Sequence, residues 1–133
     1  MTGIFCIGDG GSFLFNSRRV SSDQAVIKDI LDIFVDQVIF VSPYSAKLFP
    51  ENSGIYICDE PDLALDAKVC FMEKLPCSYS LADLDRVILY HWNRTYPADV
   101  LFPISDLRKC KKLVAQMEFS GNSHERILRE IYE

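Results

Sequence analysis

The stretch that decides the fold is Val87-Ile-Leu-Tyr-His-Trp-Asn-Arg-Thr-Tyr-Pro-Ala-Asp-Val-Leu-Phe-Pro103. Its first four residues are aliphatic, β-branched or aromatic without a break, which predicts a strand covered on both faces. The strand then runs into a polar turn at Asn93-Arg94-Thr95, and a second apolar unit follows at residues 100–103. An α/β fold commonly places a ligand where a buried strand ends in such a turn. An ordinary strand followed by a loop and an edge segment is the equally open alternative.

Length and composition limit which class of protein this chain can be. With 133 residues, 49% of them hydrophobic and 25% charged, the chain is expected to form a single globular domain over residues 1–133. The net charge of -5 argues against nucleic acid or an anionic membrane surface, since either partner needs a concentrated basic face. No apolar run approaches the ~18 residues needed to span a membrane. We therefore expect a small-molecule or protein partner.

The five cysteines predict a reducing environment. Their number is odd, and no pair has the C-x-x-C spacing of a redox or zinc motif. Cys6, Cys58 and Cys70 lie in apolar, strand-like runs and are expected to be buried, reduced thiols. No signal peptide is expected, because Met1-Thr-Gly carries no basic residue and the apolar run at residues 4–7 is short. These features predict a cytoplasmic protein.

One amphipathic helix stands out in the first half of the chain. Apolar residues recur there three and four positions apart, which predicts a helix over residues 23–34. These residues are Val26, Ile27, Ile30, Leu31 and Phe34. Ser21 or Ser22 is expected to cap the helix, with Asp23 in the first turn, where a carboxylate interacts favourably with the helix dipole.

Short apolar runs predict the strands of a sheet. The expected strands cover residues 4–7, 38–41, 55–58, 69–72 and 87–90. Residues 112–119 alternate and could form a sixth strand, whereas residues 123–133 fit either a helix or a final strand. Short helical pieces are expected at residues 44–49, 59–65 and 81–84. The run at residues 12–16 is expected to line a loop.

The order of these elements predicts the fold class. Strands alternate with helices in the first half of the chain and follow one another without helices in the second half. This order predicts a three-layer α/β domain around a central mixed, mainly parallel β-sheet.

The same order resembles the dihydrofolate reductase family over most of the chain. The family opens with a buried strand, a glycine-containing loop and an aromatic residue, as do residues 4–7, Gly10-Gly11 and Phe15 here. Asp23 matches the acidic residue that holds the pterin ring in that family. The resemblance thus implies a dihydrofolate reductase-like fold with a ligand at the start of the first helix.

The C-terminal third of the chain carries the best match. In the family a buried strand is followed by a Gly-Asp-Thr-x-Phe-Pro unit and then by a hairpin of two strands. Here residues 87–91 are followed by Ala98-Asp-Val-Leu-Phe-Pro103 and then by residues 112–119 and a Ser-His-Glu ending. The resemblance therefore favours a strand at the end of the chain.

The chain departs from the family where a nicotinamide cofactor would bind. Paired glycines follow the fourth strand in the family and let the cofactor pyrophosphate approach the backbone. Residues 71–74, Phe-Met-Glu-Lys, contain no glycine, and Glu73 would add a negative charge beside the phosphates. This departure implies a noncatalytic ligand- or protein-binding module with a degenerate nicotinamide site and no cofactor. The alternative is a small NADPH-dependent reductase of the pterin or folate type.

Five residues are candidates for the site. By the resemblance, Asp23 is the candidate catalytic residue and ligand anchor, because a carboxylate can accept two hydrogen bonds from an amidine-like ring. Phe15 and Asp99 belong to motifs that match the family, and Arg19 and Arg94 could bind a phosphate or carboxylate. The alternative for Asp23 is a helix-capping carboxylate. Asp23→Asn is expected to leave folding largely intact.

The remaining polar residues carry weaker signals. Two histidines and scattered cysteines predict no metal site. His124 with Glu125 could form an acid–base pair near Ser123, but adjacent residues on a strand point to opposite faces. Trp92 could stack on a planar ligand ring or simply cover the core.

Overall fold

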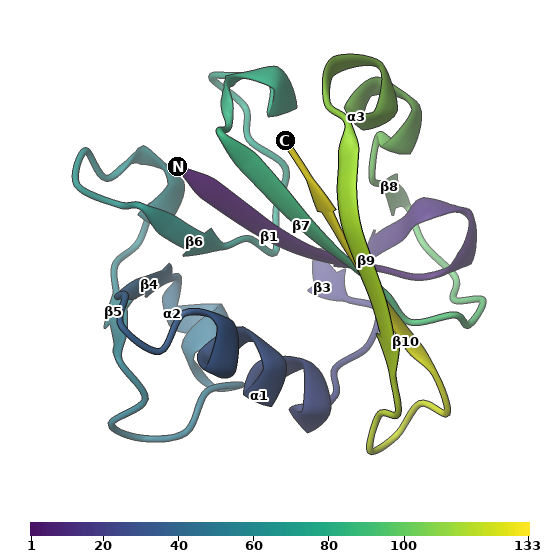
Figure 1. The fold of residues 1–133 in the computed structure, drawn as a ribbon, viewed down its shortest axis with the longest axis horizontal. Helices are drawn as coiled ribbons and strands as arrows, with labels where there is room; N and C mark the ends of the chain where they lie inside the picture. The colour runs from purple at the N-terminus through teal and green to yellow at the C-terminus, as the bar shows by residue number, and fades with distance from the viewer.

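A seven-stranded sheet runs through the centre of the protein (Figure 1). The computed structural model describes all 133 residues. Its strands are β1 (Thr2–Ile7), β4 (Ile39–Val41), β5 (Ile55–Ile57), β6 (Val69–Phe71), β7 (Arg86–His91), β9 (Leu113–Phe119) and β10 (Ile127–Tyr132). They lie in the order β5-β4-β6-β1-β7-β10-β9, and only β10 runs antiparallel to its two neighbours. The sheet is therefore mixed and mainly parallel, as the sequence predicts.

The helix α1 (Gln24–Ile33) covers one face of this sheet (Figure 1). Its apolar side is buried as the three-four spacing predicts, with Val26, Ile27 and Ile30 at most 3% exposed. These side chains share one buried cluster with Ile4 of β1 and Ile88 of β7. Burying an aliphatic side chain stabilises the fold by about 1.5–3 kcal/mol, so this contact fixes the start of α1 against the sheet.

The opposite face is covered by α3 (Ile104–Cys110) and by a small antiparallel sheet. The small sheet has the order β3 (Arg18–Arg19), β2 (Ser12–Phe15), β8 (Val100–Leu101). Two expectations from sequence are wrong here, since no helix was expected at residues 104–110 and a loop was expected at residues 12–16. α3 has seven residues and a single fully buried position, Leu107, which is too little to show helical periodicity.

The final segment is a strand, so the resemblance was the better guide there. β10 pairs with β7 and β9, which places it inside the sheet rather than at its edge. The shorter helical pieces are α2 (Pro43–Ala46) and three 3-10 turns, η1 (Asp9–Gly11), η2 (Pro61–Leu63) and η3 (Leu81–Asp83). Gly10 and Gly11 have φ angles of 74° and 89°, so the glycine cluster makes the turn that the sequence predicts.

The cysteines are all free thiols. Cys70 is buried, but Cys6 and Cys58 are only half-buried, so the prediction of three buried thiols is too strong for these two. Cys77 and Cys110 are exposed. None of the helices has the length and apolar character needed to cross a membrane.

Candidate functional site

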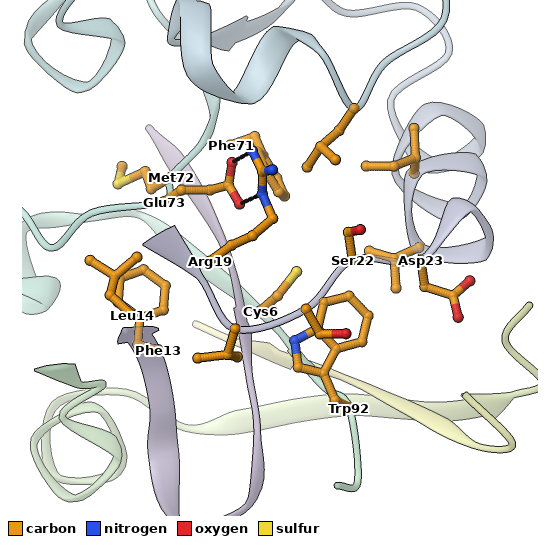
Figure 2. A pocket seen from close by; sticks show the side chains of 15 residues that line it. Cys6, Phe13, Leu14, Arg19, Ser22, Asp23, Phe71, Met72, Glu73 and Trp92 are labelled. Atoms are coloured by element: carbon orange, nitrogen blue, oxygen red, sulfur yellow. Dashed lines mark hydrogen bonds and ion pairs between the residues drawn. The ribbon is translucent and has the colours of Figure 1, made fainter. Parts of the chain in front are cut away.

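A narrow pocket lies between the start of α1, β3 and the central strands (Figure 2). Apolar side chains from β2, α1 and β6 form most of its wall, and Cys6, Arg19, Glu73 and Trp92 contribute polar groups. Its free volume is about 20 Å³, which is room for about one water molecule. Sites for drug-sized ligands measure roughly 300–1,000 Å³, so a fused ring system would enter this pocket only if side chains moved.

Asp23 lies at the wall of this pocket, but its carboxylate is used within the protein. Oδ1 accepts hydrogen bonds from the N–H groups of Ala25 at 2.8 Å and Asn122 at 2.9 Å. Oδ2 accepts from the N–H of Ser123 at 2.9 Å and its hydroxyl at 3.1 Å. Oδ2 also accepts from His124, from the N–H at 3.2 Å and from Nδ1 at 2.9 Å. Asp23 is thus the N-cap of α1, in place of the expected serine, and fastens the β9–β10 loop to the helix.

These donors hold Asp23 in its ionised form. Burial alone would raise the pKa of this carboxyl, but the hydrogen bonds from Asn122, His124, Ala25 and Ser123 outweigh burial and lower the pKa of Asp23 below its ordinary value. The side chain has no exposed surface, and both oxygens already have their donors. The arrangement supports the capping role. The ligand role stays a prediction that requires the loop to release the carboxylate.

His124 continues the hydrogen-bond chain from Asp23 towards the pocket. Its ring is 1% exposed, and Nε2 lies 3.0 Å from Ser21 Oγ and 2.8 Å from the Tyr96 hydroxyl. The Tyr96 hydroxyl also lies 3.2 Å from Ser21 Oγ. The imidazole stacks on Trp92 with ring centroids 4.6 Å apart and planes inclined by 22°. Because Ser21 lines the pocket, the network joins a buried carboxylate to the pocket wall.

This network is not predicted from the sequence. The neighbours of His124 there suggest Glu125 and Ser123 as partners, whereas the main partner is Asp23, 101 residues away. Nothing in the local sequence pairs positions so far apart. The one available signal was the resemblance to a known fold, which sets the start of the first helix beside the final hairpin.

Trp92 presents an unsatisfied donor at the pocket. The residue is 3% exposed, and its indole Nε1–H has no hydrogen-bond partner within the protein. An unpaired buried donor costs about 1–3 kcal/mol. We therefore expect an acceptor atom, from a water molecule or a ligand, to occupy the pocket beside this group.

An ion pair closes another side of the pocket, as the dashed lines in Figure 2 show. Arg19 Nε lies 2.6 Å from Glu73 Oε2, and Nη2 lies 2.8 Å from Oε1. The Ser45 hydroxyl donates to the same Oε1 at 2.7 Å, and the guanidinium carbon lies 4.1 Å from the centroid of the Tyr44 ring. The side chains of Arg19 and Glu73 are 22% and 10% exposed. Arg19 is thus engaged by a carboxylate of the protein itself.

The other three candidates lie outside the pocket. Phe15, at the end of β2, is 44% exposed. Arg94 is exposed in the turn after β7. Asp99 is exposed too, and its Oδ2 accepts a hydrogen bond from the N–H of Asn16 at 3.0 Å, which supports the β2–β3 turn. No group of three His, Cys, Asp or Glu side chains is placed to hold a metal ion.

The comparison with known proteins concerns the architecture. A solved structure titled dihydrofolate reductase from Enterococcus faecalis, complexed with NADP(H) and RAB-propyl, matches with a TM-score of 0.60 over 99% of this chain and 94% of its own. The fold is that of dihydrofolate reductase. The two sequences are 10% identical, so the likeness shows the dihydrofolate reductase-like fold and leaves the chemistry to be argued from the site. No protein-family model and no curated protein sequence matches the chain.

Proposed function

We propose that this chain is a small-ligand-binding module that has the dihydrofolate reductase-like fold but does not transfer hydride from a nicotinamide cofactor. The observation that carries the proposal is the ion pair of Arg19 with Glu73, backed by Ser45. It puts a carboxylate beside the pocket, directly after β6, where the resemblance would place the cofactor phosphates.

The residues present do not fit a cofactor pyrophosphate. A pyrophosphate is held by converging backbone N–H groups at a glycine-lined helix start. The segment after β6 here is Met72-Glu-Lys-Leu-Pro76, which has no glycine and starts no helix. Glu73 already engages the guanidinium of Arg19, so that cation is not free to bind a phosphate, and Pro76 removes one backbone donor. The single unpaired N–H of Trp92 in a mostly apolar wall suits a small neutral ligand with an acceptor atom instead.

A titration with NADPH tests the negative half of the proposal. Trp92 is the only tryptophan of the chain and lines the pocket, so its fluorescence reports on ligand entry. We expect no saturable change at micromolar NADPH. Saturable micromolar binding, together with NADPH oxidation in the presence of a dihydropterin or dihydrofolate, would overturn the proposal in favour of the small pterin or folate reductase.

A thermal-shift screen tests the positive half. Nucleotides, folates and small neutral amides are added to the native protein and to Trp92→Phe, which keeps an aromatic ring but removes the donor. A ligand present at about a hundred times its dissociation constant should add ~2.7 kcal/mol to the free energy of unfolding. We expect that gain to be largely lost in Trp92→Phe. A ligand that stabilises both proteins equally would bind elsewhere and contradict the assignment of the pocket.

A further inference from the structure

The hydrogen-bond network at the pocket can run in two directions, because the hydroxyls of both Ser21, at 3.0 Å, and Tyr96, at 2.8 Å, lie within reach of His124 Nε2. The direction in which Ser21 donates is the one that bears on reactivity. The carboxylate of Asp23 only accepts, so His124 Nδ1 carries a proton and donates to it, which leaves Nε2 as an acceptor in the neutral ring. If the Ser21 hydroxyl donates to Nε2 at 3.0 Å, the Tyr96 hydroxyl can donate to Ser21 Oγ at 3.2 Å. In this direction every hydroxyl hydrogen has an acceptor. The serine oxygen is hydrogen-bonded to a base whose other nitrogen is held by a buried carboxylate.

This order of groups is the one that activates a serine. A nucleophilic hydroxyl needs a base within about 2.6–3.2 Å and a third group that orients the base. The distances here are 3.0 Å from Ser21 Oγ to His124 Nε2 and 2.9 Å from His124 Nδ1 to Asp23 Oδ2. The imidazole is further fixed by stacking on Trp92. Asp23 itself is fixed by backbone N–H groups from both α1 and the β9–β10 loop.

Two features place the serine where a reactant can reach it. Ser21 is partly exposed and lines the pocket, whereas the imidazole beneath it is 1% exposed and shielded from water. The unpaired Nε1–H of Trp92 lines the same pocket. A carbonyl oxygen is the kind of acceptor that this donor lacks, and a preorganised donor stabilises negative charge that develops on such an oxygen.

We propose that Ser21, His124 and Asp23 form an acyl-transfer site for esters of small acyl groups, with Ser21 Oγ as the nucleophile. Because the free volume of about 20 Å³ holds about one water molecule, even an acetyl group enters only if side chains at the pocket move, and the smallest acyl groups need the least movement. His124 is the general base, and Asp23 is a positioning residue that orients it. This activity goes beyond ligand binding and involves no nicotinamide cofactor.

The chemistry balances within these groups. Ser21 Oγ forms a bond to the acyl carbon while its proton passes to His124 Nε2. The ester C–O bond then breaks, and Nε2 returns the proton to the leaving oxygen. Water attacks the acyl-serine, gives a proton to Nε2 and releases the carboxylic acid, after which the proton returns to Ser21 Oγ. Trp92 Nε1–H donates to the carbonyl oxygen during both attacks.

The test is acylation by 4-nitrophenyl acetate. We measure the release of nitrophenolate, the intact mass of the protein and the acylated residue by peptide mapping. The native protein should gain one acetyl group at Ser21, and unfolding it in urea should abolish this selectivity. Ser21→Ala removes the nucleophile and should abolish acylation at residue 21, whereas His124→Gln removes the general base and should slow it by about 100-fold or more. Acetyl groups spread over lysines and cysteines, with none on Ser21, would overturn the proposal.

The matched control is Ser22→Ala. Ser22 is the neighbouring hydroxyl, and it makes no hydrogen bond to His124, so its removal should leave acylation at residue 21 unchanged. Ser21→Ala keeps the Asp23–His124 contact and tests the nucleophile even if His124→Gln fails to fold. Equal rates in Ser21→Ala and Ser22→Ala would show that the network is purely structural and sink the proposal. This result is independent of the NADPH titration, so the two proposals can fail separately.

Discussion

Asp23 shows how the surroundings of one residue decide its role. A carboxylate at a helix start is compatible with a cap or with a ligand anchor, and the two roles differ in which donors reach it. Here six donors from Ala25, Asn122, Ser123 and His124 reach the carboxylate. Only the Ala25 donor is local in the sequence. The other five belong to the β9–β10 loop, so the side chain links two distant parts of the chain as well as capping α1.

Asp23→Asn is therefore expected to destabilise the protein, contrary to the expectation from sequence. The amide would replace one acceptor oxygen with a donor that faces other donors, leaving buried N–H groups unpaired. The cost should be roughly 2–4 kcal/mol in the free energy of unfolding, measured by urea denaturation. Asp99→Asn is the matched control, because that exposed carboxylate accepts a single hydrogen bond, and it should cost less than about 1 kcal/mol. Equal stability of Asp23→Asn and the native protein would refute the capping assignment.

The same residue predicts a pH dependence of stability. The pKa of Asp23 in the folded protein is lowered by its hydrogen bonds, whereas in the unfolded chain it is about 3.9. The folded state therefore binds fewer protons at Asp23 than the unfolded state does. The contribution of Asp23 to the free energy of unfolding is fully present above pH ~4 and is lost as the pH falls below that value. The stability gap between the native protein and Asp23→Asn should be constant from pH 7 to about 5 and should narrow from pH ~4 downwards. A gap that stays constant down to pH ~2.5 would contradict the lowered pKa.

The elements differ in how far the sequence could predict them. α1 shows a clear period because it buries one face, and the central strands stand out as unbroken apolar runs because both of their faces are buried; all lie within a few residues of the predicted bounds. α3 is missed because only Leu107 is fully buried, and a single position has no period. The Asp23–His124 network is missed for a different reason, since its partners come from α1 and the β9–β10 loop. Local pattern predicts elements, whereas the site depends on which elements the sheet order brings together.

The ion pair of Arg19 and Glu73 should couple β3 to the segment after β6. Each of Arg19→Met and Glu73→Leu leaves a mostly buried charge without its partner and should cost about 1–3 kcal/mol, less than a fully buried pair because Arg19 is 22% exposed. The double variant should lose clearly less free energy of unfolding than the two single variants lose together. The difference should give a coupling energy of about 1–2 kcal/mol in a double-mutant cycle. The exposed pair of Arg86 with Glu133, at 44% and 45% exposure, is the control and should couple by less than about 1 kcal/mol. Equal coupling energies in the two pairs would show that burial does not strengthen the Arg19–Glu73 interaction.

At the scale of the whole molecule, the position of a strand in the sheet decides how much of the sheet must separate before the side chains of that strand reach solvent. β6 lies between β4 and β1 in the parallel part of the sheet. Its side chains enter the buried clusters on both faces, Val69 and Phe71 on the side of α1 and Cys70 on the side of α3. A central strand cannot expose its side chains by fraying, because both of its neighbours must separate first. Cys77 and Cys110, in contrast, are exposed in the folded protein. The free thiols therefore report on the opening of different parts of the molecule.

Thiol labelling should separate these positions, with Cys70 of β6 reacting last. Burial, reinforced by the carboxylate of Asp62, raises the pKa of Cys70 to about 12, so neither the thiolate nor access is available in the folded state. We expect an aromatic disulfide reagent to react quickly with Cys77 and Cys110, more slowly with the half-buried Cys6 and Cys58, and with Cys70 only through global unfolding. The labelling rate of Cys70 in dilute urea gives a free energy of opening. This free energy should equal the free energy of unfolding from equilibrium denaturation, and both should fall with urea concentration by the same slope. Cys77→Ser with Cys110→Ser removes the fast phase and leaves the Cys70 rate unchanged. Rapid labelling of all five thiols in the native protein would show that the centre of the sheet opens locally and would contradict the packing described for β6.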